Sequence, residues 1–316
     1  MRGAPAISVR ALRKAYGEKV VLDGLDLEIP AGSIFALLGP NGAGKTTTVG
    51  ILSTLVAADG GSVRVAGHDP ATNPDAVRAA IGVTGQFSAV DGLLTGEENL
   101  VLMADLHHLD RAEGRRRSRE LLERFDLVDA AHKPAATYSG GMRRRLDLAM
   151  GLVGRPRVLF LDEPSTGLDP RSRRALWDVI RELAATGVTV LLTTQYLEEA
   201  DQLAERIAVL DHGRIVAAGT PDELKDLVPG GHVRLTFPDA ARYDAAARVL
   251  TGAVRDDAAL ALQVSCGGTA HEIRDLLDEL DRRGLVADRL TVHTPDLDDV
   301  FLALTGRPAP AEAMSR

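Results

Sequence analysis

The sequence predicts an α/β fold, because short buried strands alternate with an amphipathic helix in the middle of the chain. Three apolar runs, IFALL (34–38), VLFL (158–161) and VTVLLTT (188–194), are typical of strands buried on both faces of a parallel sheet. A helical pattern at 173–186 separates the last two runs. Strand, crossover helix and strand form the βαβ unit, so a parallel core is expected. The apolar face of the crossover helix comprises Leu176, Val179, Ile180 and Leu183.

Other patterns extend this core on both sides. Alternating segments at 7–12 and 20–29 predict half-buried antiparallel strands before the first buried strand. From 95 to 153 the pattern is helical throughout, which predicts a helical insertion. We expect the core to end with a hairpin at 206–219 and a helix that starts at Pro221.

A second, smaller domain is predicted after the glycine-containing segment VPGG (228–231), which is a plausible linker. Beyond it the order strand, helix, two short strands, helix, strand indicates a small ferredoxin-like α+β domain with one extra helix. We therefore divide the chain into residues 1–227, with a helical subdomain at about 88–153, and residues 228–316. In the last helix, a domain core and an interface are both open for the apolar residues Leu297, Val300, Phe301 and Leu304. We expect three scattered histidines, without metal-ligand spacing, to be solvated or structural: His232, His271 and His293.

Composition limits the classes of function. The 316 residues carry a net charge of −8, which argues against a broad electrostatic contact with nucleic acid. The single cysteine, Cys266, excludes an internal disulfide and is typical of a reducing compartment. No apolar run approaches the roughly 18 residues that a membrane span needs, and the N-terminus does not resemble a signal peptide. These features predict a cytosolic protein without a segment inserted in the membrane.

Residues 39–46, GPNGAGKT, match the phosphate-binding pattern G-x-x-x-x-G-K-[ST] between a buried strand and a helical segment. Glycines allow the backbone to approach an anion, and the helix that follows adds the positive end of its dipole. We expect Lys45 to neutralise the β- and γ-phosphates and the Thr46 hydroxyl to ligate Mg²⁺. The predicted nucleotide contacts here are Gly39, Asn41, Gly42, Ala43, Gly44, Lys45, Thr46 and Thr47.

The segment VLFLDEP supplies an acidic partner for this loop. Its apolar run places Asp162 and Glu163 at the carboxyl end of a central strand, where open α/β sheets bind their ligands. Asp162 is suited to hold Mg²⁺ directly or through water, and Glu163 to polarise a water for attack on the γ-phosphate. Together the two segments predict a site that binds ATP with Mg²⁺ and hydrolyses it.

A second glycine-rich segment, TYSGGMRRRLD (137–147), precedes an arginine-rich helix. Taken alone it reads as a turn and a helix cap, but YSGGM about twenty residues before VLFLDEP resembles the signature motif of ATP-binding-cassette (ABC) ATPases. The resemblance covers residues 7 to about 225. It implies a homodimer in which Ser139, Gly140 and Gly141 of one chain contact the γ-phosphate held by the other.

Four further positions carry roles that this resemblance implies. Tyr16 is similar to the aromatic that stacks on adenine. Gln86 matches the glutamine of the loop that joins the core to the helical insertion, and the resemblance implies that it takes part in catalysis and holds Mg²⁺. Asp169 ends STGLD, which is similar to the loop that communicates with the second subunit and nucleotide. Gln195 departs from the family, which usually has a catalytic histidine there. Its amide can donate a hydrogen bond but cannot titrate, so we expect a pH–rate profile without a histidine limb.

A narrower resemblance links the chain to ATP-binding subunits of daunorubicin/doxorubicin-type drug exporters. TGQFSAVDGLLTGEENL, LLTTQYLEEADQLA and LDDVFLALTG all look like that subfamily, including its glutamine at 195. The resemblance implies a peripheral subunit at the cytoplasmic face of the membrane, with a separate permease contacting residues near 87–107. Export of a lipid or glycan precursor and a weakly hydrolysing nucleotide switch remain open. A soluble ATPase acting on ribosomes or DNA is disfavoured by the single cassette and the negative charge.

Overall fold

The computed structural model describes residues 4–86, 88–228, 231–266 and 270–306. They form two compact units, one ending at Pro221 and the other beginning at Asp222. The domain boundary expected from the sequence, between 227 and 228, lies a few residues further on. Residues 229–230 of the proposed linker lie outside the described residues. None of the helices in the described part of the chain is long and apolar enough to cross a lipid bilayer.

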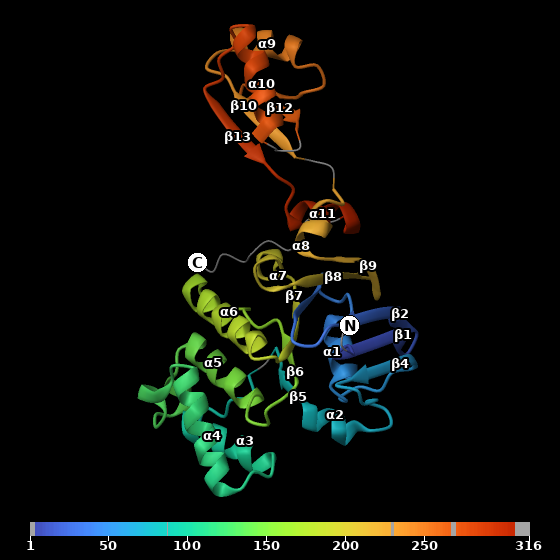
Figure 1. The fold of residues 1–316 in the computed structure, drawn as a ribbon, viewed down its shortest axis with the longest axis vertical. Helices are drawn as coiled ribbons and strands as arrows, with labels where there is room; N and C mark the ends of the chain where they lie inside the picture. Colours follow the sequence, from blue (N-terminus) through green and yellow to red (C-terminus); the bar gives the residue numbers. More distant parts are fainter. Residues whose placement is uncertain (1–3, 87, 229–230, 267–269, 307–316) are drawn as a thin grey trace. The chain divides into compact units, whose positions relative to one another are not determined.

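The first unit is built from two sheets and the helices around them (Figure 1). Its strands are β1 (Ile7–Tyr16), β2 (Lys19–Ile29), β3 (Ile34–Leu38), β4 (Gly60–Val65), β5 (Ile81–Thr84), β6 (Val158–Asp162), β7 (Thr189–Thr194), β8 (Arg206–Asp211) and β9 (Arg214–Gly219). Its helices are α1 (Lys45–Leu52), α2 (Pro74–Ala80), α3 (Gly96–Leu106), α4 (Arg111–Arg124), α5 (Gly140–Gly151), α6 (Pro170–Ala185) and α7 (Leu197–Leu203), with short 3₁₀ turns at Val128–Ala130 and Ala135–Thr137. Pro221, the last residue of this unit, is also the first residue of α8 (Pro221–Lys225).

The larger sheet has the order β5-β6-β7-β3-β8-β9 and is parallel apart from β9. Every residue of β3, β6 and β7 is buried, which confirms that these apolar runs are covered on both faces. The smaller sheet, β2-β1-β4, is antiparallel, with Ile7 paired to both Ile29 and Val65. The expected α/β core, antiparallel subdomain and helical insertion are therefore all confirmed.

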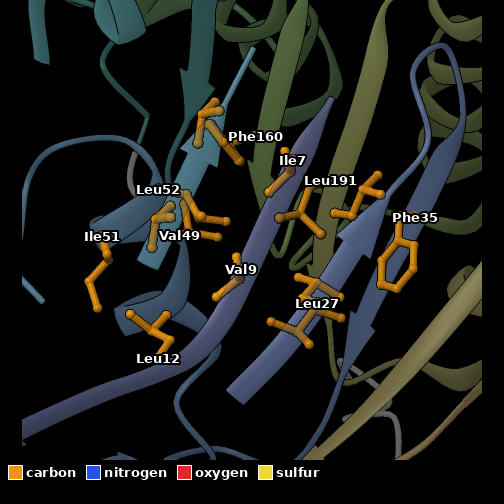
Figure 2. Packing of buried hydrophobic residues seen from close by; sticks show 14 of the residues in the cluster. Ile7, Val9, Leu12, Leu27, Phe35, Val49, Ile51, Leu52, Phe160 and Leu191 are labelled. Carbon is orange, nitrogen blue, oxygen red and sulfur yellow. The ribbon is translucent and has the colours of Figure 1, made fainter. Parts of the chain in front are cut away.

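The main core fills the space between the two sheets and includes α1. Figure 2 shows Ile7 and Val9 of β1 in one cluster with Val49 and Leu52 of α1 and Phe160 of β6. Burial of such side chains stabilises the fold by about 1.5–3 kcal/mol each. Because α1 is held by this cluster, the loop that precedes it has a fixed position at the carboxyl end of β3.

The crossover helix α6 differs from its predicted face at one position. Leu176, Ile180 and Leu183 are buried as expected, but Val179 is only half-buried and Trp177 is buried in its place. The indole Nε1 of Trp177 donates a hydrogen bond to the buried Glu199 on α7 at 3.2 Å. Because the indole N–H has this partner, the large ring can be buried. The buried face of α6 therefore includes Trp177 in place of Val179.

The second unit has the predicted element order. Its elements are β10 (His232–Thr236), α9 (Ala240–Val249), β11 (Val254–Asp256), β12 (Ala261–Ser265), α10 (Ala270–Arg282), β13 (Arg289–His293) and α11 (Leu297–Thr305). The antiparallel sheet order β11-β12-β10-β13 confirms the ferredoxin-like arrangement. Its core forms around Val233, Leu235 and Tyr243. In α11 the apolar residues Leu297, Val300 and Phe301 are buried and Leu304 is half-buried, but none belongs to that cluster.

Two of the three scattered histidines contact each other in this unit. The rings of His232 and His293 lie 4.7 Å apart, and His293 Nε2 is 3.0 Å from Asp299 Oδ2 on α11. Within the described ranges, no group of three or more histidine, cysteine or acidic side chains could hold a metal ion. The histidine pair therefore joins a strand to the last helix.

Candidate nucleotide-binding site

Residues 39–44 form a tight loop between β3 and α1. Gly42 and Gly44 have φ values of +83° and +112°, in the left-handed region that favours glycine. A Cβ atom at Gly44 would lie 2.7 Å from Leu22 Cδ2, so a larger residue would also clash with the neighbouring strand. Position 44 therefore requires glycine for two reasons: its positive φ and the lack of room for a side chain.

Lys45 points back into this loop and is buried. Its Nζ donates hydrogen bonds to the carbonyls of Gly39 at 2.8 Å and Pro40 at 3.3 Å, and lies 3.4 Å from Glu163 Oε1. Burial lowers the pKa of Lys45 from its ordinary value, and the nearby Glu163 carboxylate opposes that effect. A phosphate group placed at the loop would give this ammonium a second anionic partner beside Glu163.

The two acidic residues sit at the carboxyl end of β6. Asp162 is buried and accepts a hydrogen bond from the Thr193 hydroxyl of β7. Glu163 is buried beside it with φ +48°, an uncommon conformation for a residue other than glycine. Its N–H donates to the Thr193 carbonyl at 3.0 Å. Such strained backbone costs on the order of 1–3 kcal/mol and occurs preferentially at functional sites.

A hollow of about 280 Å³ brings the loop and the acid together. Its lining is Lys19, Val21, Asn41, Gly42, Gly44, Lys45, Thr46, Thr47, Gln86 and Glu163. Eight of these residues were predicted as site residues, whereas Lys19 and Val21 were missed. The register of β1 and β2 pairs Lys19 with Tyr16, so the hairpin that carries the expected adenine-stacking residue could have indicated them. A larger hollow of about 560 Å³, near α1, β4 and α2, contains none of the predicted site residues.

Nine predicted site residues lie outside the lining of the 280 Å³ hollow: Gly39 and Ala43 of the phosphate loop, the signature residues Ser139, Gly140 and Gly141, and Tyr16, Asp162, Asp169 and Gln195. Tyr16 is 51% exposed at the end of β1, with Lys14 Nζ 5.3 Å from its ring centroid. Asp162 directly precedes the lining residue Glu163, whereas Gln195 follows β7 and is half-buried. The Thr194 carbonyl accepts a hydrogen bond from Gly39 N at 3.3 Å, which ties the segment before Gln195 to the phosphate loop.

The segment at 139–141 forms the N-terminus of α5. Ser139 is its N-cap and accepts a hydrogen bond from Met142 N at 3.3 Å. Gly140 is exposed, and a Cβ atom there would meet no heavy atom within 4 Å. At Gly141 a Cβ atom would lie 2.7 Å from Ser172 Oγ on α6. Gly141 therefore leaves room for the Ser172 side chain, while none of the described residues requires Gly140 to be small.

Asp169 performs a local function at the start of α6. Its carboxylate accepts hydrogen bonds from Arg171 N and Ser172 N, both at 3.0 Å, and from Ser172 Oγ at 2.6 Å. The Ser172 side chain is the main cause that lowers the pKa of Asp169. The residue thus caps α6 beside the signature segment, because Ser172 also faces Gly141.

The donor atoms near the phosphate loop fit a magnesium ion. Thr46 and Gln86 are exposed and line the same hollow, and Asp162 lies at the adjacent strand end. Hydroxyl, amide and carboxylate oxygens are ligands that Mg²⁺ accepts. It is commonly held by few protein ligands together with phosphate oxygens and water.

Comparisons with known proteins agree with this geometry. The family model described as ABC transporter matches residues 22–166. The daunorubicin/doxorubicin resistance ATP-binding protein DrrA of Streptomyces peucetius is 50% identical, over 96% of this chain and 93% of that protein. The doxorubicin resistance ATP-binding protein DrrA of Mycobacterium tuberculosis H37Rv is 44% identical, over 96% and 94%. The Nod factor export ATP-binding protein I of Ralstonia nicotianae is 38% identical, over 96% and 94%.

Solved structures share the fold. The ATP binding subunit of an ABC transporter superposes with a TM-score of 0.64 at 30% identity, covering 70% of this chain and 92% of that one. The cbiO1 protein of Clostridium perfringens gives a TM-score of 0.64 at 25% identity, covering 70% and 91%. The phosphate loop, the acidic strand end and relatives that match almost the whole sequence lead to one conclusion: this chain belongs to the ABC transporter family, as one of its ATP-hydrolysing, ATP-binding subunits.

Proposed function

We propose that two copies of this chain bind Mg²⁺-ATP between them and that its hydrolysis drives export through a separate membrane permease. The observation that carries the hydrolytic site is the buried pair of Lys45 and Glu163, whose charged atoms lie 3.4 Å apart. They share one hollow with Gln86 and Thr46. Lys45, which can bind a phosphate, and Glu163, which can activate a water, are therefore close enough to contact the same nucleotide.

Each residue of the site has a distinct role in this proposal. Lys45 and the loop amides bind the phosphates, and the open ring of Tyr16 stacks on adenine. Thr46, Gln86 and Asp162 hold Mg²⁺, which supplies charge neutralisation when bound. Glu163 accepts the proton of the attacking water. The Gln195 amide orients that water or donates to the γ-phosphate without titrating.

The second half of the site comes from the other copy. Ser139 and Gly140 are exposed at the N-terminus of α5, a helix of 12 residues, and that end attracts anions. The space around Gly140 admits a phosphate from outside the chain. Asp169 lies next to this segment through Ser172 and contacts the partner or its nucleotide in the closed pair.

The cargo is proposed from the relatives. Those at 50% and 44% identity are named for resistance to daunorubicin or doxorubicin, so an amphipathic drug is the first choice. The relative at 38% identity is named for Nod factor export, which favours a lipid or glycan precursor as the second. In both cases the chain would act at the cytoplasmic face of the membrane, as a peripheral subunit.

The experiment is reconstitution of the full chain in vesicles with a permease that co-purifies with it. We expect ATP hydrolysis that doxorubicin stimulates and that Glu163→Gln abolishes. Stimulation by a lipid-linked oligosaccharide and not by the drug would establish the second cargo. Turnover no higher than that of Glu163→Gln would contradict the export motor and leave a nucleotide-binding switch.

A further inference from the structure

Arg144 and Asp147 form a buried ion pair on α5 that has no role in the site described so far. Arg144 is 9% exposed and Asp147 3%, and Arg144 Nη1 lies 3.1 Å from Asp147 Oδ2. Burial lowers the pKa of Arg144 and raises the pKa of Asp147, and the ion pair opposes both effects. Burying two charges is costly unless their hydrogen-bonding atoms are satisfied, so their partners show what the pair does.

The guanidinium of Arg144 binds backbone carbonyls on both sides of Glu163. Its Nε donates to Pro164 O at 2.8 Å, and its Nη2 lies 3.5 Å from Asp162 O. Glu163 has the strained φ of +48°, and on its other side its N–H is held by Thr193. A conformation of this kind persists only where surrounding contacts enforce it, and Arg144 supplies part of that enforcement.

The same pair also holds the segment around Gln86. Arg144 Nη1 donates to Gly85 O at 3.0 Å, and Asp147 Oδ1 accepts from Ala89 N at 3.0 Å. The carbonyl before Gln86 and an amide three residues after it are therefore tied to one turn of α5.

We propose that Arg144 and Asp147 are positioning residues that fix Glu163 and Gln86 relative to each other and to the signature segment at the start of α5. This inference rests on the proposed roles of those two residues. Arginine suits the task because its planar fork serves several acceptors at once, whereas lysine offers a point charge. The ion pair with Asp147 orients the Arg144 guanidinium. Arg144 lies on α5, whose N-cap is Ser139, so one rigid helix connects the signature segment with Glu163 and Gln86.

The chain contains a matched control. Arg117 on α4 is 8% exposed, pairs with Glu120 three residues on at 2.6 Å, and donates to Leu152 O at 2.9 Å. Arg117 is as buried as Arg144, with the same ion-pair spacing and a backbone carbonyl as partner, although Glu120 is 46% exposed and Asp147 only 3%. Its contacts lie within the helical insertion, away from Glu163 and Gln86. A purely structural function predicts equal consequences for Arg144→Gln and Arg117→Gln.

The test measures kcat, the Kd for ATP without Mg²⁺, and the Mg²⁺ concentration for half-maximal rate, in the full chain assembled with its permease. For Arg144→Gln we expect kcat to fall about 10–100-fold, as when groups that orient a reactive site are lost. The Kd for ATP should stay within about twofold, because the phosphate loop is untouched. The half-maximal Mg²⁺ concentration should rise several-fold. Arg117→Gln should lower the melting temperature comparably and leave all three values unchanged.

Two conservative variants keep the test decisive if Arg144→Gln folds poorly. Arg144→Lys keeps the charge and Asp147→Asn keeps the acceptor for Ala89, so both should fold and still lose turnover. Wild-type kcat and Mg²⁺ dependence in Arg144→Lys and Asp147→Asn would overturn the proposal, as would equal losses in Arg117→Gln. If instead the unmodified chain showed no hydrolysis that depends on Glu163, the proposed site, and not this inference, would be at fault.

Discussion

The N-termini of α1 and α5 are both proposed to contact phosphate, but their surroundings within the chain differ. At α1, glycines with positive φ fold the loop back and Lys45 is buried against its carbonyls and Glu163. At α5, Ser139 caps the helix, Gly140 faces open space, and no residue of the segment lines the hollow. The contrast supports the proposal that the first terminus supplies the phosphate loop of one site, whereas the second completes the site of the other copy.

The largest effect is expected for Glu163→Gln, which changes the carboxylate beside Lys45 at the N-terminus of α1. It removes the carboxylate that accepts a proton but keeps the side-chain size. We expect kcat to fall by about 10²–10⁴-fold, the usual contribution of a positioned base. ATP affinity should persist, because Lys45 and the loop amides remain. Comparison of single-turnover hydrolysis with equilibrium binding separates the two effects. A variant that hydrolyses ATP at the original rate would remove Glu163 from the chemistry.

A pair of alanine substitutions compares the two termini directly. Gly44→Ala places a methyl group at φ +112° and 2.7 Å from Leu22 Cδ2, so we expect a loss of about 1–3 kcal/mol in the free energy of unfolding. Gly140→Ala meets no atom and should change that free energy by less than about 0.5 kcal/mol. Denaturant unfolding of the full chain measures both. Equal losses in the free energy of unfolding would show that other residues of the same chain also pack against Gly140.

The smallest effect concerns Glu199, which is fully buried behind the segment that carries Gln195. Burial raises the pKa of this carboxyl, so its neutral form is favoured in the folded chain. Stability is therefore lost as pH rises from the ordinary glutamate value, near 4.5, through the raised folded value. Glu199→Gln keeps an acceptor for Trp177 and does not titrate. Its melting temperature relative to the original should increase with pH across that range. A pH-independent difference would argue against a neutral Glu199.

The sequence contained the fold and most of the site, but not the reasons for several residues. Continuous apolar runs identified β3, β6 and β7, because burial on both faces makes the middle of each strand apolar. Periodicity could not choose Trp177 over Val179, since that depends on a hydrogen bond to a helix that follows a later strand. The strained backbone of Glu163 and the carbonyls around Arg144 depend on loops far apart in the chain. The motif gave Gly140 and Gly141 one meaning, whereas Gly141 also makes room for Ser172.

The most direct test of a site shared between two chains places Lys45→Ala and Ser139→Arg either in the same chain or in opposite chains of a tagged pair. In a Glu163→Gln background, retained ATP per pair is measured after gel filtration. If each nucleotide lies between the phosphate loop of one chain and the signature segment of the other, the opposite-chain pair keeps one intact site and retains ATP. The same-chain pair, completed by a chain with neither change, retains none. The reverse result, with ATP retained only by the same-chain pair, would show that each site is complete within one polypeptide.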